Sequence, residues 1–422
     1  MRARLVLGLS WLVLGATFSP RLSLATRVSN LGVATSAEDV SAAVAAEVAP
    51  TPGRSRVKAK PIGVGACAPD EIITNEDLAT LVDTSDDWVK TRTGISSRHV
   101  MAPGEQFRTI AQTAAQRAIT NSGVDPQDVG LVIFATSCVC ICAGPNPSRL
   151  ATIKTSLRPN LCAHSTPDDL FGDAPAIARA IGATNAVAFD LTAACSGFLF
   201  ATVTASQFLH TGAFKNAVVV GGDAMSRWVD WEDRNTCILF GDGAGAMVMQ
   251  GVDDDQQSGL LGFSMHSNGK DSEYLQLPYS GSSRKLATGG DGHAVTTGAY
   301  APITMNGKKV YTFACREVPT VITEALTNAG LTIDDVDWVL LHQANIRIMQ
   351  SVAEKLGVSF DKVLTNLCEY GNTSAGSIPL ALEEAVSSGK VKEGDVIVCA
   401  GFGAGLSWGA AVLRWGEGSA SG

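Results

Sequence analysis

The chain has 422 residues, 45% of them hydrophobic and 17% charged, enough for a large buried core and for two or three domain-sized units. A formal net charge of −9 argues against nucleic acid as a partner. The ten cysteines show no regular framework spacing, which indicates reduced thiols in a reducing compartment.

The first 57 residues have the composition of a targeting leader, which we expect to be removed. Two arginines precede an apolar run at residues 5–15 that suits a signal-peptide core better than a membrane span. The following stretch is rich in Ser, Thr, Ala and Arg, and the first acidic residue is Glu38, as in organelle transit peptides. A signal followed by a transit peptide predicts delivery to the stroma of a plastid bounded by extra membranes. No later run could span a bilayer, so we expect no membrane span in the mature protein.

One internal repeat is visible. Residues 121–134 align without gaps on residues 328–341, with identities at Asn121/Asn328, Gly123/Gly330, Asp128/Asp335, Val129/Val336 and Val132/Val339. Each copy follows a helical pattern and leads into an apolar strand. The spacing is far longer than that of solenoid repeats, which indicates a duplicated domain.

The two copies are followed by similar elements. The first leads to a strand at 186–189, the turn with Cys195, a helix to about residue 209 and a strand at 217–221. The second leads to a strand at 363–364, a turn at 371–374, a helix to about residue 386 and a strand at 395–399. This alternation predicts α/β layers in two halves, residues 58–235 and 236–417. It also places Cys195 and Asn372 at equivalent turns, whose helix N-termini could meet at one central site.

Cys195 follows an apolar run and precedes a Ser-Gly pair that opens a helical pattern, in residues 189–198. Free N–H groups and the helix dipole favour a thiolate at such a position. They can lower a thiol pKa from roughly 8.5 into the range of about 3.5–7.5. This segment alone is equally consistent with an acyl-carrying nucleophile and with a small buried cysteine.

A cysteine nucleophile commonly has a base that is near in space and distant in sequence. His342 is the best candidate among the six histidines, because it ends the apolar strand 338–341 and opens a polar turn. A structural histidine is the alternative. Two glycine-rich stretches, 241–246 and 401–405, lack the fingerprint of nucleotide loops, so we expect close backbone packing there. The second stretch can also present N–H groups to an oxyanion.

Several motifs occur in the order known for one family. They are DLTAACSG at 190–197, HQAN at 342–345, YGNTSA at 370–375, GFGAG at 401–405, TSDDW at 84–88 with TRTGI at 91–95, and DR at 233–234 before FGDG at 240–243. Over residues 58–415 the chain resembles β-ketoacyl-acyl-carrier-protein synthase III, the condensing-enzyme family that initiates type II fatty acid synthesis. The resemblance implies a thiolase-like duplicated α/β/α/β/α layered fold with mixed central sheets.

The resemblance also implies a Cys–His–Asn triad of Cys195, His342 and Asn372. The expected reaction joins an acyl-CoA primer, acetyl-CoA in the first instance, to malonyl-acyl-carrier protein and gives 3-oxoacyl-carrier protein, CoA and CO2. The backbone N–H groups of Cys195 and Ala404 would hold the oxyanion. His342 and Asn372 would stabilise the enolate left by decarboxylation. No metal and no redox cofactor is expected.

Further residues acquire roles from the resemblance. Trp88, Arg92 and Arg234 would contact CoA, the tryptophan by stacking and the arginines through phosphate. Without it, a solvated surface charge is the simpler interpretation of both arginines. Phe171 would reach across a homodimer and cap the primer pocket of the neighbouring subunit, whereas a core phenylalanine is the alternative.

The surface for the acidic carrier protein matches the family only in part. Arg347 and Lys355 match basic positions that meet the carrier, whereas two other positions of that patch are Thr312 and Glu354 here. The carrier surface of this chain therefore departs from the family pattern at these two positions.

The largest departure from the family is a segment of roughly 28 residues at 138–165, with cysteines at Cys138, Cys140, Cys142 and Cys162. A retained intron in the gene model explains it best, followed by a disordered insertion. Metal binding explains it least well, because alternating cysteines do not match zinc-site spacing.

Three other functions share some of these sequence features. A biosynthetic thiolase would use Cys399 in C-x-G-x-G as a second cysteine, but the Asn372 motif argues against it. A type III polyketide synthase shares the triad and uses CoA-linked extenders. A non-catalytic carrier-binding relative would not need the triad.

Overall fold

The computed structural model describes residues 57–137, 168, 172–253, 258–285, 294–298 and 300–416, which belong to one compact unit. The predicted leader before Val57, the segment 138–165 and Phe171 lie outside the described residues. Within the described ranges, no helix is both long and apolar enough to cross a bilayer.

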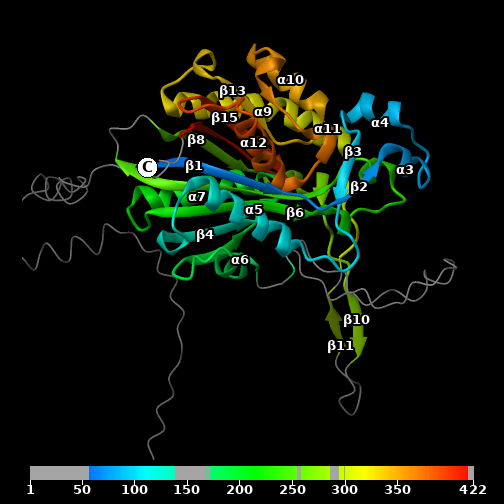
Figure 1. Cartoon of the computed structure of the whole chain (residues 1–422). Coiled ribbons are helices and arrows are strands. Elements are labelled where there is room, and N and C mark those ends of the chain that lie inside the picture. The colour runs from blue at the N-terminus through cyan, green and yellow to red at the C-terminus, as the bar shows by residue number, and fades with distance from the viewer. Residues whose placement is uncertain are drawn as a thin grey trace, which may run out of the picture. The chain divides into compact units, whose positions relative to one another are not determined.

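Two five-stranded sheets with the same strand order form the centre of the fold (Figure 1). The first contains, in spatial order, β1 (Val57–Cys67), β7 (Asp242–Asp253), β6 (Asn216–Ala224), β4 (Val129–Ala135) and β5 (Val187–Leu191). The second contains β8 (Gly259–Ser267), β16 (Ser407–Arg414), β15 (Val396–Gly403), β13 (Trp338–Leu341) and β14 (Val363–Leu364). In both sheets the first two pairings are antiparallel and the last two parallel. The predicted duplication and mixed sheets are confirmed.

Helices cover both sheets in three layers. α5 (Phe107–Ser122) and α6 (Ala174–Ala180) pack on the first sheet in one hydrophobic cluster. α9 (Gly307–Ala329) and α10 (Ile346–Leu356) pack on the second sheet in another. α7 (Gly197–His210) and α12 (Ser377–Ser387) share a cluster with strands of both sheets, so they lie between the sheets. This is the expected α/β/α/β/α arrangement (Figure 1).

Shorter elements connect these layers. Between β1 and α5 the chain forms four short elements, which are β2 (Glu71–Thr74), α3 (Asn75–Ala79), α4 (Asp86–Thr93) and β3 (Ser97–Val100). α8 (Arg234–Cys237) precedes β7, and α11 (Leu367–Tyr370) precedes α12. The connection from β8 to α9 contains β9 (Leu275–Gln276), β10 (Ser282–Lys285), β11 (Ala294–Thr297) and β12 (Thr304–Met305).

The repeated segment has a physical explanation. Gly123 and Gly330 end α5 and α9 in the left-handed region, at φ +68° and +70°, where glycine is favoured. A short 3-10 turn containing Asp128 or Asp335 then leads into β4 or β13. The identities between the two copies therefore mark how each helix ends and how the next strand begins.

The boundary predicted between the halves falls before β7, the last strand along the chain that belongs to the first sheet. β7 begins at Asp242, beyond the predicted boundary at residues 235/236, and pairs with both β1 and β6 of the first sheet. The first sheet therefore extends to Asp253. The parallel-strand pattern used on the sequence did not reveal this antiparallel strand.

Candidate active site

Two matching turns meet at the centre of the molecule. Ala194 and Ser374 have φ values of +48° and +51°, and they are the non-glycine residues with positive φ in the described part of the chain. Each begins a 3-10 turn that leads three residues later into the first residue of α7 or α12. The two turns are equivalent, as predicted. When they are aligned on Ala194 and Ser374, however, Cys195 corresponds to Ala375 and not to Asn372. Asn372 lies before its turn, while Cys195 lies within its own.

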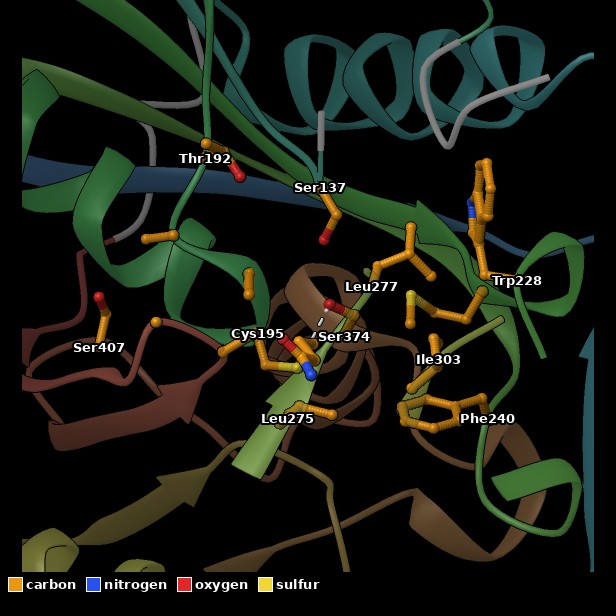
Figure 2. Close-up of a pocket in the computed structure, with 16 residues that line it drawn as sticks. Ser137, Thr192, Cys195, Trp228, Phe240, Leu275, Leu277, Ile303, Ser374 and Ser407 are labelled. Atoms are coloured by element: carbon orange, nitrogen blue, oxygen red, sulfur yellow. Dashed lines mark hydrogen bonds between the residues drawn. The ribbon is translucent and has the colours of Figure 1, made fainter. Parts of the chain in front are cut away.

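Cys195 is 6% exposed and lies beside Ser374, whose hydroxyl donates a hydrogen bond to Sγ at 3.4 Å (Figure 2). The expected low thiol pKa is wrong for this structure. Burial raises the pKa of Cys195 to about 12, and the hydrogen bond from Ser374 opposes only part of this rise. A helix N-terminus favours the thiolate, but removal of the sulfur from water has the larger effect.

His342 lies at the end of β13, as expected, and is 3% exposed. Its backbone N–H donates to the carbonyl of Ala400, which ties the strand end to β15. The ring nitrogen Nδ1 is 2.7 Å from the hydroxyl oxygen of Ser377, at the start of α12. Burial lowers the pKa of His342 to about 3, so the ring is neutral at physiological pH.

Asn372 is held by its backbone and by its side chain. Its N–H donates to the carbonyl of Leu239, and its own carbonyl accepts from the N–H of Gly241. The side-chain oxygen Oδ1 accepts from the N–H of Ser374 at 2.9 Å. Since a backbone N–H can only donate, this contact assigns the amide orientation and leaves Nδ2 as the donor.

The three predicted catalytic residues line one chamber of about 230 Å³. Leu239, Phe240, Leu275 and Phe402 supply part of its apolar wall. On one side a cavity of about 380 Å³ shares Cys195, Phe240 and Leu275 with the chamber (Figure 2). Its further lining is mainly apolar and includes Met225, Trp228, Leu277 and Ile303.

An outer recess of about 540 Å³ shares Met305 and Gly307 with the chamber and is lined by Trp88. The residues predicted to contact CoA are brought together there. The guanidinium carbons of Arg92 and Arg234 lie 4.5 Å and 4.6 Å from the centroid of the Trp88 ring. These distances suit cation–π interactions. The outer recess beside Trp88 therefore adjoins the chamber that contains Cys195.

The predicted carrier-contact residues both lie on α10. Arg347 is exposed, and its Nε donates to the carbonyl of Thr91 at 3.1 Å, next to Arg92. Lys355 is exposed at the other end of the helix, and its ammonium donates to the carbonyl of Cys315 at 2.9 Å. Arg347 thus lies near the outer recess, whereas Lys355 connects α10 to α9.

Ala404 lines the apolar cavity with Cys195, and the preceding strand comes close to Cys195. A Cβ atom on Gly403 would lie only 2.7 Å from the backbone nitrogen of Cys195. The glycine-rich stretch therefore provides close backbone packing, as expected. Cys399, in the same strand, is 3% exposed and lines neither the chamber nor the cavity.

Asp223, at the end of β6, was not singled out from the sequence. It is fully buried, and its carboxylate accepts from the Ser137 N–H at 2.6 Å, the Thr136 hydroxyl at 2.9 Å and the Ala375 N–H at 3.2 Å. It also interacts with the hydroxyl of Ser374. Asp223 thus joins the end of β4 to the turn beside Cys195. An acidic residue after an all-apolar strand was the signal available in the sequence.

Comparisons with known proteins identify the family of the chain. The family model for the C-terminal part of 3-oxoacyl-[acyl-carrier-protein] synthase III matches residues 326–415. A second family model for the same synthase matches residues 189–269. The β-ketoacyl-[acyl-carrier-protein] synthase III of Thermosynechococcus vestitus is 52% identical over 353 residues, 84% of this chain and 97% of the relative. The chain belongs to the β-ketoacyl-[acyl-carrier-protein] synthase III family.

Other synthase III proteins match a similar share of this chain at lower identity. The enzyme of Trichormus variabilis is 48% identical over 84% of this chain and 97% of its own length. The crystal structure of synthase III from Aquifex aeolicus is 37% identical, with a TM-score of 0.70 over 85% of this chain and 100% of that chain. The Thermus thermophilus structure is 35% identical, with a TM-score of 0.71 over 85% and 99%. The predicted family, the thiolase-like fold and the condensing-enzyme class are confirmed.

Proposed function

We propose that this synthase III condenses an acyl-CoA primer, acetyl-CoA in the first instance, with malonyl-acyl-carrier protein, and so initiates type II fatty acid synthesis. The observation that carries the proposal is the single chamber lined by Cys195, His342 and Asn372. It lies between an apolar cavity that can hold an acyl chain and a recess beside Trp88 that can hold CoA. Membership of the family supports the same reaction.

In the first half-reaction, the Cys195 sulfur attacks the thioester carbonyl, and its proton ends on the departing CoA sulfur. We expect the backbone N–H groups of Cys195 and Ala404 to stabilise the oxyanion that forms. Collapse of the tetrahedral intermediate breaks the bond from carbon to the CoA sulfur and leaves the acyl group on Cys195. The CoA thiolate leaves and takes up a proton.

In the second half-reaction, malonyl-carrier enters the chamber and loses CO2. The electron pair of the broken carbon–carbon bond passes into the thioester as an enolate, whose oxygen can accept hydrogen bonds from His342 and Asn372. The enolate carbon then attacks the acyl group on Cys195. The Cys195 thiolate departs and takes up a proton from solvent, which gives 3-oxoacyl-carrier protein and restores the thiol of the enzyme.

Intact-protein mass spectrometry tests this function. After exposure to a series of acyl-CoAs, the enzyme should gain the mass of one acyl group, and malonyl-carrier should then discharge it as 3-oxoacyl-carrier. Turnover with malonyl-CoA in place of malonyl-carrier would support a polyketide-synthase-like reaction instead. Condensation of two acetyl-CoA molecules without malonyl-carrier would support a thiolase. Absence of any acyl-enzyme would support a non-catalytic carrier-binding protein.

The close approach of β15 to Cys195 leads to a mutational prediction. Gly403→Ala should reduce the rate of acyl-enzyme formation by at least about a hundredfold, because its Cβ would displace the Cys195 N–H from the oxyanion position. Gly401→Ala is a matched control in the same strand, since its Cβ would come no closer than 3.5 Å to another atom. Equal acylation rates in the two variants would contradict this role for the Cys195 N–H.

We also propose that the chain works as a homodimer in the plastid stroma. β5 is the outer strand of the first sheet, and Val187 on it is 53% exposed. Light scattering on the protein from residue 58 onward tests the dimer, and a monomeric mass would contradict it.

Fusion of residues 1–57 to a fluorescent protein tests the leader, whose basic start and late first acidic residue support plastid delivery.

We propose that the same enzyme meets an acidic acyl carrier protein through the α10 face, in which Arg347 lies beside the segment that contains Arg92. Arg347 combines exposure with proximity to the outer recess, whereas the ammonium of Lys355 is bonded to a backbone carbonyl. Charge attraction between this face and an acidic partner would weaken as salt concentration rises.

A further inference from the structure

We propose that Ser377 is a positioning residue that holds His342 as the neutral tautomer with its proton on Nε2, so that His342 donates a hydrogen bond to the enolate. The inference rests on the proposed condensation, since it assigns a role within that reaction. Its basis is the 2.7 Å contact between His342 Nδ1 and Ser377 Oγ. The direction of this one hydrogen bond decides which ring nitrogen carries the proton.

The surroundings of the Ser377 hydroxyl decide that direction. Ser377 is 1% exposed, so solvent does not take its proton. The backbone N–H of Gln343 donates to Ser377 Oγ at 3.3 Å, a contact that uses an oxygen lone pair and not the hydroxyl proton. Among the described residues, His342 Nδ1 is the acceptor within reach of that proton. Because a buried hydroxyl without an acceptor is costly, Ser377 donates to Nδ1.

An imidazole that accepts at Nδ1 carries its proton at Nε2. The ring lines the chamber, and its edge-on packing against Phe402, with centroids 5.4 Å apart at 74°, opposes a flip that would exchange the nitrogens. Asn372 is oriented in the same way, because the Ser374 N–H holds Oδ1 and leaves Nδ2 to donate. Ser377 at the start of α12 and Ser374 in the turn before it therefore orient His342 and Asn372, the two proposed donors to the enolate.

The tautomer separates two roles that the sequence left open for His342. A ring with its proton on Nδ1 would present a lone pair at Nε2 and could take the proton of Cys195. A ring with its proton on Nε2 donates into the chamber and accepts no proton there. The Ser377 contact selects the second role, in decarboxylation, and not the first, in thiol activation.

The test uses Ser377→Ala and Ser377→Thr in the enzyme labelled with ¹⁵N-histidine. Ser377 has helical backbone angles, φ −65° and ψ −41°, which both replacements can adopt. The imidazole ¹H–¹⁵N correlation pattern, assigned to His342 with a His342→Ala reference, should show the Nε2–H tautomer in the unsubstituted enzyme and in the threonine variant. The alanine variant should lose this preference.

Half-reactions give the second readout. Release of labelled CO2 from malonyl-carrier should fall about tenfold to a hundredfold in Ser377→Ala. Ser377→Thr should restore it, because the hydroxyl remains. Acylation of Cys195 by acetyl-CoA should be unchanged in both, which shows that the variants are folded.

The inference is overturned if the unsubstituted enzyme shows the Nδ1–H tautomer. It is also overturned if the alanine variant keeps both its tautomer and its rate of decarboxylation, or if threonine fails to restore that rate. Failure of the unsubstituted enzyme to release CO2 from malonyl-carrier would instead contradict the proposed function. The tautomer signal can be read in either case.

Discussion

Replacement of Cys195 by alanine should abolish the acyl-enzyme and reduce condensation by more than about a thousandfold, because no other described group in the chamber can form the thioester. Intact-protein mass spectrometry with acetyl-CoA measures the first effect, and formation of acetoacetyl-carrier measures the second. Malonyl-carrier should still bind the variant, since the recess beside Trp88 is untouched.

Cys399→Ala is the matched control for this prediction. Both cysteines are buried, and burial raises the pKa of each thiol to about 12, but Cys399 does not line the chamber. The variant should keep its acyl-enzyme and its condensation activity. Loss of condensation in Cys399→Ala, with acylation of Cys195 intact, would revive the thiolase interpretation.

His342→Ala and Asn372→Ala should each separate the two half-reactions. The acyl-enzyme should still form, while release of CO2 from malonyl-carrier falls by about a hundredfold to a thousandfold, because each variant loses one donor to the enolate oxygen. The double variant should fall by less than the product of the two effects, since the donors act on one atom. If His342→Ala lost acylation to the same extent, a role as base for Cys195 would be indicated.

The pH profile of decarboxylation gives an independent measure of the same residue. Burial lowers the pKa of His342 to about 3, so the rate should stay level from about pH 8 down to about pH 5.5. A tenfold fall per pH unit below about pH 6.5 would show that the ring protonates in this range.

The free energy of unfolding depends on the same lowered pKa of His342. The unfolded chain takes up this proton below about pH 6.5, so the contribution of His342 is complete above that value and is lost as pH falls toward 3.

Much of this fold could be predicted because both halves of the sequence contain the same succession of elements. The identity of Gly123 and Gly330 reflects a left-handed helix end that few other residues can adopt, so it remains visible in the sequence. The antiparallel β7 was missed because its glycine-rich start resembles a loop, although the strand runs through Asp253. A strand buried between β1 and β6 can contain many small residues, which makes its pattern weak.

The sequence indicated the candidate catalytic residues but not the residues that surround them. Cys195, His342 and Asn372 each follow a strand or a turn that marks them in the sequence. Ser377 and Asp223 act through hydrogen bonds to residues 35 and 152 positions away, and no local pattern indicates such contacts. The pKa of Cys195 was also mispredicted, because the helix start is local whereas the burial of the sulfur depends on both halves of the fold.

Phe240 connects acyl capacity to the position of the amide donor. It lines both the apolar cavity and the chamber, and it forms a β-bridge with Asn372. A change at Phe240 that enlarges the acyl space would therefore also move Asn372. Met225, Leu277 and Ile303 line the cavity but not the chamber. Substitutions at those three positions can therefore change the volume of the apolar cavity without altering the lining of the chamber, whereas a substitution at Phe240 alters both.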